Sequence, residues 1–108
     1  MAAALIWSNE SLEDIDAIAR FIARDSPRHA QRVVEAVFDL GDVVLAHPRA
    51  GRIVPELGNP DVRERFLYSY RLIYEIQSVP GVSPERIAML AVLHGRRLLE
   101  SIGERFDD

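Results

Sequence analysis

Residues 86–97 read RIAMLAVLHGRR, an apolar run that ends abruptly in a histidine, a glycine and two arginines. Arg86 to His94 suits a strand of roughly 30 Å, at about 3.3 Å per residue, and Gly95 then interrupts it. Both alternating rows of this strand are apolar, which indicates cover on two faces of a sheet. The rows are Ile87, Met89, Ala91 and Leu93 on one side and Ala88, Leu90 and Val92 on the other. We expect a chain this short to lack helices for both faces, so that a partner would cover one of them.

Length and composition predict a soluble globular protein with a single domain over residues 1–108. The chain is 48% hydrophobic and 28% charged, and it is long enough to bury a core without disulfides or metals. It has no cysteine, which excludes disulfides, thiolate metal ligands and cysteine nucleophiles. The N-terminus does not read as a signal peptide, and no apolar run approaches the roughly 18 residues of a membrane span. We therefore expect a cytoplasmic protein that does not contact membranes.

All 13 basic residues are arginine, so no lysine is available as a general base or Schiff-base former. Residues 1–48 hold four arginines against eight acids, whereas residues 49–97 hold eight arginines against five acids. The net charge of −4 argues against general binding to a phosphate backbone. A local arginine patch in the second half remains open.

The first half reads as a strand followed by a helical hairpin. Residues 3–7 form a short apolar run that predicts an opening strand. Ser11 offers a helix N-cap, and apolar residues then recur at helical spacing. Ser26 and Pro27 are a cap and a first helical residue for a second, longer helix that ends before Pro48. The short join between the helices predicts an antiparallel hairpin.

The second half changes to extended periodicity after Pro48. We predict, in chain order, a weak extended piece, two strands, a long hairpin loop, the strand described first and a small helix. Their ranges are 53–57, 63–68, 71–77, 78–85, 86–94 and 98–106. The class is therefore α+β, with an N-terminal strand and an antiparallel helical hairpin packed on a three- to four-stranded antiparallel sheet, and a short C-terminal helix.

Four segments, taken together in this order, resemble the RelE/ParE superfamily of bacterial toxins, closer to its ParE branch. They are Trp7-Ser8 before the helical hairpin, HPRAGR at 47–52, YRLIY at 70–74 and VLHGRR at 92–97. The resemblance covers almost the whole chain and implies the RelE/ParE-like fold. It also implies the toxin half of a type II toxin-antitoxin pair, of the kind associated with plasmid stabilisation. A small, partly disordered cognate antitoxin would then fold onto the toxin as a hetero-oligomer and cover the sheet or the hairpin.

The superfamily contains two activities, so the target must be argued apart from the fold. RelE-like members cut messenger RNA in the ribosome, whereas ParE-like members poison DNA gyrase and are not known as nucleases. The absence of lysine, the net acidic chain and the ending at 94–97 resemble the ParE branch. We expect a gyrase inhibitor that is not an enzyme and needs no cofactor. The alternative is a ribosome-dependent mRNA endoribonuclease, and a third reading is a member kept only as a repressor or binding module.

Arginines on two predicted strands are candidate contacts to a target or antitoxin. Arg63 and Arg65 lie two apart and so share a face, where they could clamp a phosphate or pair with neighbouring Glu64 or Glu75. Arg71 on the next strand could extend this patch or form a structural salt bridge. The nearby tyrosines at 68, 70 and 74 are expected to pack in the core and at the edge of the sheet.

The end of the strand first described supplies three more candidate contacts. His94 could act as an acid or base near neutral pH, or simply cap the strand end. Arg96 and Arg97 are consecutive, so at most one points into any given groove. In the RelE-like alternative, the catalytic patch would consist of Arg63, Arg65, Arg71 and His94. The histidines are scattered without ligand spacing, so we expect no metal site.

Overall fold

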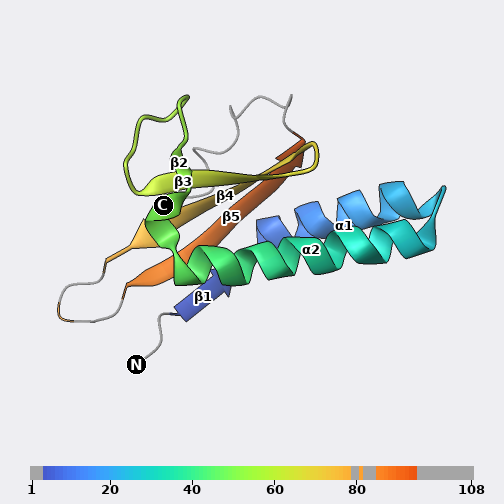
Figure 1. The fold of residues 1–108 in the computed structure, drawn as a ribbon, viewed down its shortest axis with the longest axis horizontal. Coiled ribbons are helices and arrows are strands. Elements are labelled where there is room, and N and C mark those ends of the chain that lie inside the picture. The colour runs from blue at the N-terminus through green and yellow to red at the C-terminus, as the bar shows by residue number, and fades with distance from the viewer. Residues whose placement is uncertain (1–3, 79–80, 82–84, 95–108) are drawn as a thin grey trace.

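The computed structural model describes residues 4–78, 81 and 85–94, which form two layers (Figure 1). The helices α1 (Asn9–Ala23) and α2 (Pro27–Ala46) pack on one face of a five-stranded sheet with the order β1-β5-β4-β3-β2. The strands are β1 (Ala4–Trp7), β2 (Arg52–Ile53), β3 (Val62–Leu67), β4 (Tyr70–Gln77) and β5 (Arg86–His94), and a short 3-10 helix, η1 (Pro48–Ala50), precedes β2. The predicted α+β class is confirmed. The predicted C-terminal helix lies outside the described residues.

The sheet has more strands than predicted, because a short strand joins it at each edge. β1 pairs in parallel with the first half of β5, and the other pairings are antiparallel. β5 is therefore an interior strand, which accounts for its apolar residues on both faces. The extended piece predicted over 53–57 shortens to β2, since Pro55 cannot donate a ladder hydrogen bond.

The cap of α1 lies one turn earlier than predicted. Ser8, not Ser11, is the N-cap, and its Oγ accepts from the Ser11 backbone N–H at 3.0 Å. The chain can turn this early because the Ser8 N–H donates to the Met89 carbonyl at 3.0 Å, directly after the last pairing of β1. Ser11 is fully buried, and its hydroxyl donates a hydrogen bond to the Ser8 carbonyl at 2.7 Å.

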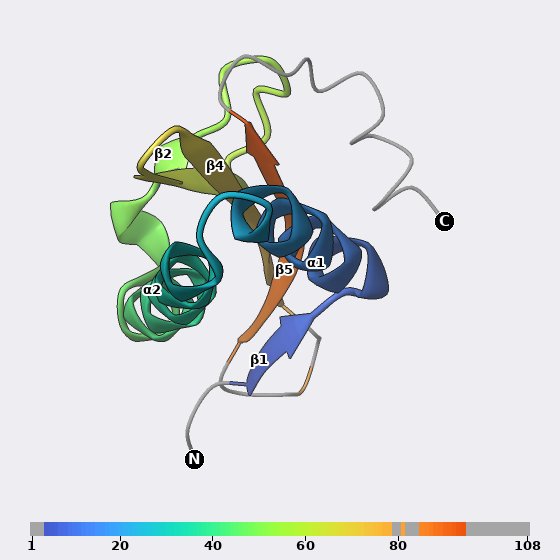
Figure 2. The same cartoon turned by 90° about the vertical axis from the view of Figure 1, so that its right-hand side faces the viewer.

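The predicted start of α2 is confirmed. Ser26 Oγ accepts from the His29 N–H at 3.1 Å, and Pro27 occupies the first turn, where its missing N–H leaves no bond unmade. The join is closed by the N–H groups of Asp25 and Ser26, which both donate to the Ile22 carbonyl. Figure 2 views the two helices end-on and shows them side by side as an antiparallel hairpin. Among the described residues, no helix is long and apolar enough to cross a membrane.

Two apolar clusters lie on opposite faces of the sheet. The helix-side cluster joins the hairpin to the sheet through Ile15, Val33, Val37, Val44, Leu72, Tyr74, Ile76, Ile87, Met89 and Val92. The outer cluster consists of Val54, Val62, Ile73, Leu90, Ala91 and Leu93, with Leu57 and Ala88 packed against it. The connection between β2 and β3 supplies Val54 and Leu57, so part of the outer face is covered by the chain itself.

A β-bulge at Leu90 overturns the predicted alternation of β5. Ile73 pairs with Ala91 but Tyr74 pairs with Met89, so Leu90 is an extra residue in the ladder. As a result Val92 joins the helix-side cluster, whereas Ala91 joins Leu90 on the outer side. The predicted rows are therefore right as far as Leu90 and wrong from Ala91 onward.

The expectation that one row of β5 stays uncovered without a partner is also wrong for these residues. Leu90 and Val92 are only 4% and 3% exposed. Polar side chains near the start of α1 bond the backbone of β5 beyond the end of β1: Ser8 Oγ donates to the Leu90 carbonyl at 3.3 Å, and Asp14 Oδ2 accepts from the Val92 N–H at 3.0 Å. Helix α1 thus takes the place of a neighbouring strand.

Candidate functional site

The strand register distributes the candidate arginines over both faces of the sheet. Arg63 pairs with Tyr74 and Arg65 pairs with Leu72, so both arginines lie on the helix side, as their spacing predicts. Arg71 pairs with Phe66 and lies on the outer face. Arg71 therefore does not extend the Arg63 and Arg65 patch, and that prediction is wrong. Its alternative, a structural salt bridge, is confirmed.

Arg71 is held between two carboxylates. Its Nε donates to Glu64 Oε1 at 2.7 Å, and its terminal nitrogens donate to the two Glu56 oxygens at 2.9 and 3.1 Å. The Arg71 side chain is 7% exposed and that of Glu64 is fully buried. Glu64 Oε2 also accepts from Arg52, so one carboxylate serves two guanidinium groups. We call Arg52, Glu56, Glu64 and Arg71 the outer ion cluster.

The ion pair of Arg71 with Glu56 favours the charged forms of both side chains. The hydrogen bond from Arg71 lowers the pKa of the Glu56 carboxyl below its ordinary value. The hydrogen bond from Glu56 in turn raises the pKa of Arg71, with Glu64 adding to the effect. Two arginines and two glutamates leave the cluster with no net charge. Because its donors already point at carboxylates, Arg71 has little capacity left for a phosphate.

Arg63 is bound to backbone carbonyls around η1 and the turn before β3. Its Nε donates to the Pro60 carbonyl at 2.9 Å, and its Nη1 donates to the carbonyls of Arg49 and Gly51 at 3.0 and 3.1 Å. These bonds fix the path of the chain from α2 into β2. The role of Arg63 in the described structure is therefore to hold two loops together.

The motifs at 47–52 and 70–74 meet at the same place. The Tyr74 hydroxyl donates to the Pro48 carbonyl at 2.5 Å, and burial raises the pKa of this phenol. A Cβ added at Gly51 would lie 2.2 Å from the Tyr74 hydroxyl, so only glycine fits against the ring. Tyr74 is fully buried, which confirms its predicted place in the core. These two motifs are therefore packing features of the fold.

A bidentate pair ties the same region to β5. Arg49 donates to both Glu85 oxygens at 2.8 Å, and the Ser78 hydroxyl donates to Glu85 at 2.8 Å. The hydrogen bond from Arg49, followed by that from Ser78, lowers the pKa of Glu85 to about 2. Glu85 directly precedes β5, so the pair links η1 to the last hairpin of the sheet.

Arg65 and His94 both lie on the helix side of the sheet. Arg65 is half-buried and, within residues 4–78, 81 and 85–94, makes no hydrogen bond or ion pair. His94 is exposed, pairs with Tyr70 across the ladder and packs edge-on against its ring, with the centroids 6.0 Å apart. β4 separates the strands that carry Arg65 and His94. Arg96 and Arg97 lie outside the described residues.

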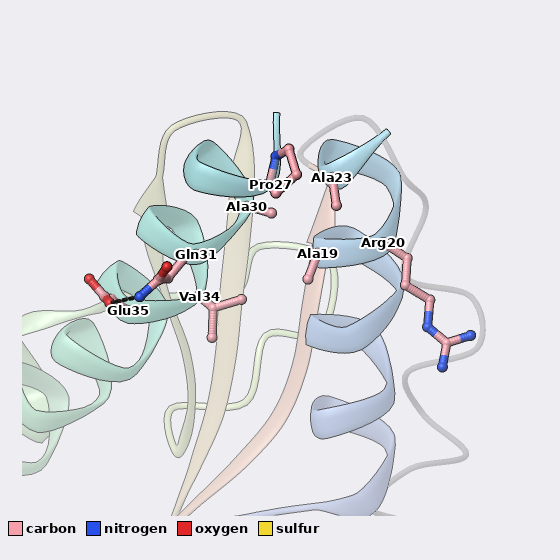
Figure 3. Close-up of a pocket in the computed structure, with 8 residues that line it drawn as sticks. All are labelled: Ala19, Arg20, Ala23, Pro27, Ala30, Gln31, Val34 and Glu35. Carbon is pink, nitrogen blue, oxygen red and sulfur yellow. Dashed lines mark hydrogen bonds between the residues drawn. The ribbon is translucent and has the colours of Figure 1, made fainter. Parts of the chain in front are cut away.

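Two further surface features escaped sequence reasoning. A hollow of about 370 Å³ lies between the C-terminal half of α1 and the N-terminal half of α2 (Figure 3). Its residues are Ala19, Ala23, Pro27, Ala30 and Val34, with Arg20, Gln31 and Glu35. The spacing of small residues on the two helices is the signal that could have indicated the hollow.

Tyr68 is 69% exposed in the turn between β3 and β4, so the prediction that it packs against the sheet is wrong. Among the described residues, no group of three or more His, Cys, Asp or Glu could hold a metal ion.

Comparison with solved structures identifies the class of the fold. The chain is similar to the chromosomal ParDE toxin-antitoxin system from P. aeruginosa, with a TM-score of 0.64, 19% identity and coverage of 85% of this chain and 95% of that chain. It is similar to the YoeB/ParE toxin from Agrobacterium tumefaciens, with a TM-score of 0.59, 19% identity and coverage of 84% and 96%. It is also similar to the toxin-antitoxin complex RelBE2 from Mycobacterium tuberculosis, with a TM-score of 0.53, 23% identity and coverage of 87% of this chain and 99% of that chain. The fold is therefore that of the RelE/ParE-like toxins.

The family is established by sequence. Residues 5–99 match the family described as the ParE toxin of type II toxin-antitoxin system, parDE. The chain belongs to this family and is the toxin component of a type II toxin-antitoxin system. No curated protein matches the chain significantly.

Proposed function

We propose that this ParE-family toxin acts by inhibiting DNA gyrase and that a cognate antitoxin holds it inactive. The observation that carries the choice of target is the dispersal of the residues that a nuclease would need. Arg71 lies on the outer face between Glu56 and Glu64, whereas Arg63 and Arg65 lie on the helix side. The four candidate catalytic residues thus do not form a common patch.

The chemistry of RNA cleavage explains why dispersal matters. Cleaving a phosphodiester requires a positioned acid and base together with cations aimed at the charge that develops on the phosphate. Arg63 already donates to three carbonyls and Arg71 to two carboxylates. The remaining pair, Arg65 and His94, stands on strands separated by β4. This arrangement supports a toxin that binds its target over one that cuts RNA.

An antitoxin partner is supported by the related systems and by exposed apolar side chains. The P. aeruginosa relative comes from a ParDE toxin-antitoxin system, and the M. tuberculosis relative is in a complex with its antitoxin. In this chain, β1 and the helices expose large apolar side chains at 38–44% of their surface. They are Ile6, Leu12, Phe38 and Val43. An antitoxin that covers them would gain free energy from the burial of apolar area.

The first test is a supercoiling assay with purified gyrase. We expect the toxin to inhibit supercoiling in a dose-dependent manner, and we expect the antitoxin encoded beside its gene to restore activity. A catalytically unrelated topoisomerase serves as the control and should remain active. Unimpaired supercoiling at toxin concentrations that saturate antitoxin binding would contradict the gyrase proposal.

The nuclease alternative is favoured by one observation: Arg63, Arg65 and His94 share the helix side of the sheet. It predicts cleavage of messenger RNA on translating ribosomes, with cleavage abolished in Arg65→Ala and His94→Ala. Arg32→Ala, a change at an exposed arginine on α2, is the matched control. Absence of ribosome-dependent cleavage by the wild-type toxin excludes this alternative.

A further inference from the structure

The turn between β3 and β4 contains an unusual backbone conformation. Tyr68 and Ser69 alone connect the paired residues Leu67 and Tyr70. Tyr68 has φ = 54°, the only positive φ at a non-glycine residue among the described residues. This left-handed region suits glycine and asparagine, since a bulky side chain there clashes with the backbone. A glycine at this position would therefore fit the turn better than the tyrosine.

The fold makes no use of the Tyr68 side chain. It is 69% exposed, and in the described part of the chain it forms no hydrogen bond and no ring contact. The turn thus holds Tyr68 in a strained backbone conformation while its ring is exposed to solvent. Strain at an exposed residue that contributes nothing to packing indicates a role outside the fold.

The neighbouring residues complete an aromatic and cationic surface. Phe66, two residues before Tyr68, is 56% exposed. The Arg52 guanidinium stacks on the Phe66 ring, 5.2 Å from its centroid, and its side chain remains 58% exposed. We call Arg52, Phe66 and Tyr68 the hairpin-tip patch. Aromatic residues and arginine are enriched among the residues that contribute most of the binding energy in protein interfaces.

The charges around the hairpin-tip patch favour a protein over a nucleic acid as its occupant. Binding of single-stranded nucleic acid combines aromatic stacking with uncompensated cations along the backbone. Here Arg52 and Arg71 are matched by Glu56 and Glu64, so the outer ion cluster beneath the patch is neutral. A neutral surface with exposed rings fits an apolar pocket of a folded protein.

The position of the patch separates it from the apolar surface assigned to the antitoxin. Figure 1 shows the β3–β4 turn at the end of the sheet away from β1. The apolar residues assigned above to the antitoxin lie on β1, α1 and α2, and none of them belongs to this turn. They are Ile6, Leu12, Phe38 and Val43. A protein bound at the hairpin tip is therefore best matched to the target of the toxin.

We infer that the hairpin-tip patch is the surface by which the toxin engages its protein target, with the Tyr68 ring inserted into an apolar pocket of that protein. This inference rests on the proposed function, in which the toxin acts by binding a protein. The pocket would accept the ring of Tyr68, and a carboxylate at its rim would contact the exposed edge of Arg52.

The decisive variant is Tyr68→Gly, because it removes the ring while relieving the backbone. We expect a melting temperature equal to or above that of the wild type and an unchanged affinity for the antitoxin. We expect at least a tenfold loss of affinity for immobilised gyrase and a matching loss of growth arrest on induction. Phe21→Ala is the matched control, since Phe21 is 66% exposed on α1, and it should behave as the wild type in both target assays.

The outcomes separate this inference from the proposed function. If Tyr68→Gly arrests growth as strongly as the wild type, the inference is wrong whatever the target is. If the wild type arrests growth without affecting gyrase, and Tyr68→Gly does not arrest growth, gyrase is the wrong target but the patch is retained. Loss of antitoxin affinity in Tyr68→Gly would overturn the inference. Tyr68-dependent binding of a single-stranded oligonucleotide would also overturn it.

Discussion

At the scale of single residues, Glu64 determines the chemistry of the outer face. Its carboxylate is fully buried and accepts from both Arg52 and Arg71. Sequence position alone places Glu64 between two arginines of the same strand, but these neighbours point to the opposite face. The partners it has in the structure come from β2 and β4. One buried acid thus converts two cations of the sheet into structural groups.

We predict that Glu64→Ala lowers the free energy of unfolding by about 3–5 kcal/mol, because it leaves the buried Arg71 without one of its two carboxylates. Urea denaturation followed by circular dichroism measures the change. Glu35→Ala, at an exposed residue of α2, is the control and should stay within about 0.5 kcal/mol of the wild type. A loss below about 1 kcal/mol for Glu64→Ala would show that the cluster contributes little to stability.

At the scale of elements, the helical hairpin follows directly from the sequence, whereas the sheet does not. The caps and the proline at 26–27 and the apolar spacing that follows determine α2, because these signals are local. The bulge in β5 has no such signal, since every residue around Leu90 is apolar and an extra one leaves no trace in the pattern. The faces of Arg63 and Arg71 relative to each other depend on the two-residue turn at Tyr68, which spacing within one strand does not report.

α2 also contains a glycine whose role is to admit a neighbouring ring. A Cβ added at Gly41 would lie 2.6 Å from Trp7 Cζ2, and Trp7 also packs edge-on against Phe38 with ring centroids 4.7 Å apart. In an open helix, Gly→Ala would stabilise by about 1 kcal/mol through helix propensity. We predict the opposite sign here, a destabilisation of about 1–3 kcal/mol, because the added methyl group forces the indole to move.

The measurement for Gly41→Ala uses the single tryptophan of the chain. We expect a shift in Trp7 emission together with a lower urea midpoint. Ala17→Gly, on the exposed face of α1, is the control: it should cost about 1 kcal/mol by propensity and leave the emission unchanged. A more stable Gly41→Ala variant with native emission would contradict this packing argument.

At the scale of the whole molecule, bonds between distant segments join the loops to the sheet. Arg49 with Glu85 and Tyr74 with Pro48 link residues far apart in the chain. The resemblance of four short segments predicted the family and the class of fold. In the structure, Pro48 and Gly51 contact Tyr74, and residues 70–72 pair with residues 92–94. The resemblance did not predict the hairpin-tip patch, since Tyr68 and Phe66 lie outside the segments that carry it. An exposed side chain leaves no periodic signal.

Acid should weaken the whole fold over a defined range. The pKa of Glu85 is lowered from 4.5 to about 2 in the folded state, so its stabilising effect is complete above 4.5 and is lost as the pH falls towards 2. Glu56, whose pKa is also lowered, acts in the same direction. We predict that the free energy of unfolding decreases with acidification through this range, and that added salt reduces the dependence.

Denaturation with urea at a series of pH values tests this dependence. Glu85→Gln should show a shallower decrease than the wild type between pH 4.5 and 2, because it lacks the titrating group. Glu13→Gln, at an exposed acid of α1, is the control and should follow the wild-type curve. Identical slopes for Glu85→Gln and the wild type would mean that the pair with Arg49 does not form in solution.

The contact between Tyr74, Pro48 and Gly51 has a consequence for how such toxins can diverge. These residues hold the scaffold, and none of them belongs to the hairpin-tip patch or meets solvent as a binding group. On the inference above, substitutions in the hairpin-tip patch would change the protein that the toxin binds, while the scaffold stays intact. Related toxins could then differ in target and still share the motifs at 47–52 and 70–74, which carry the family resemblance.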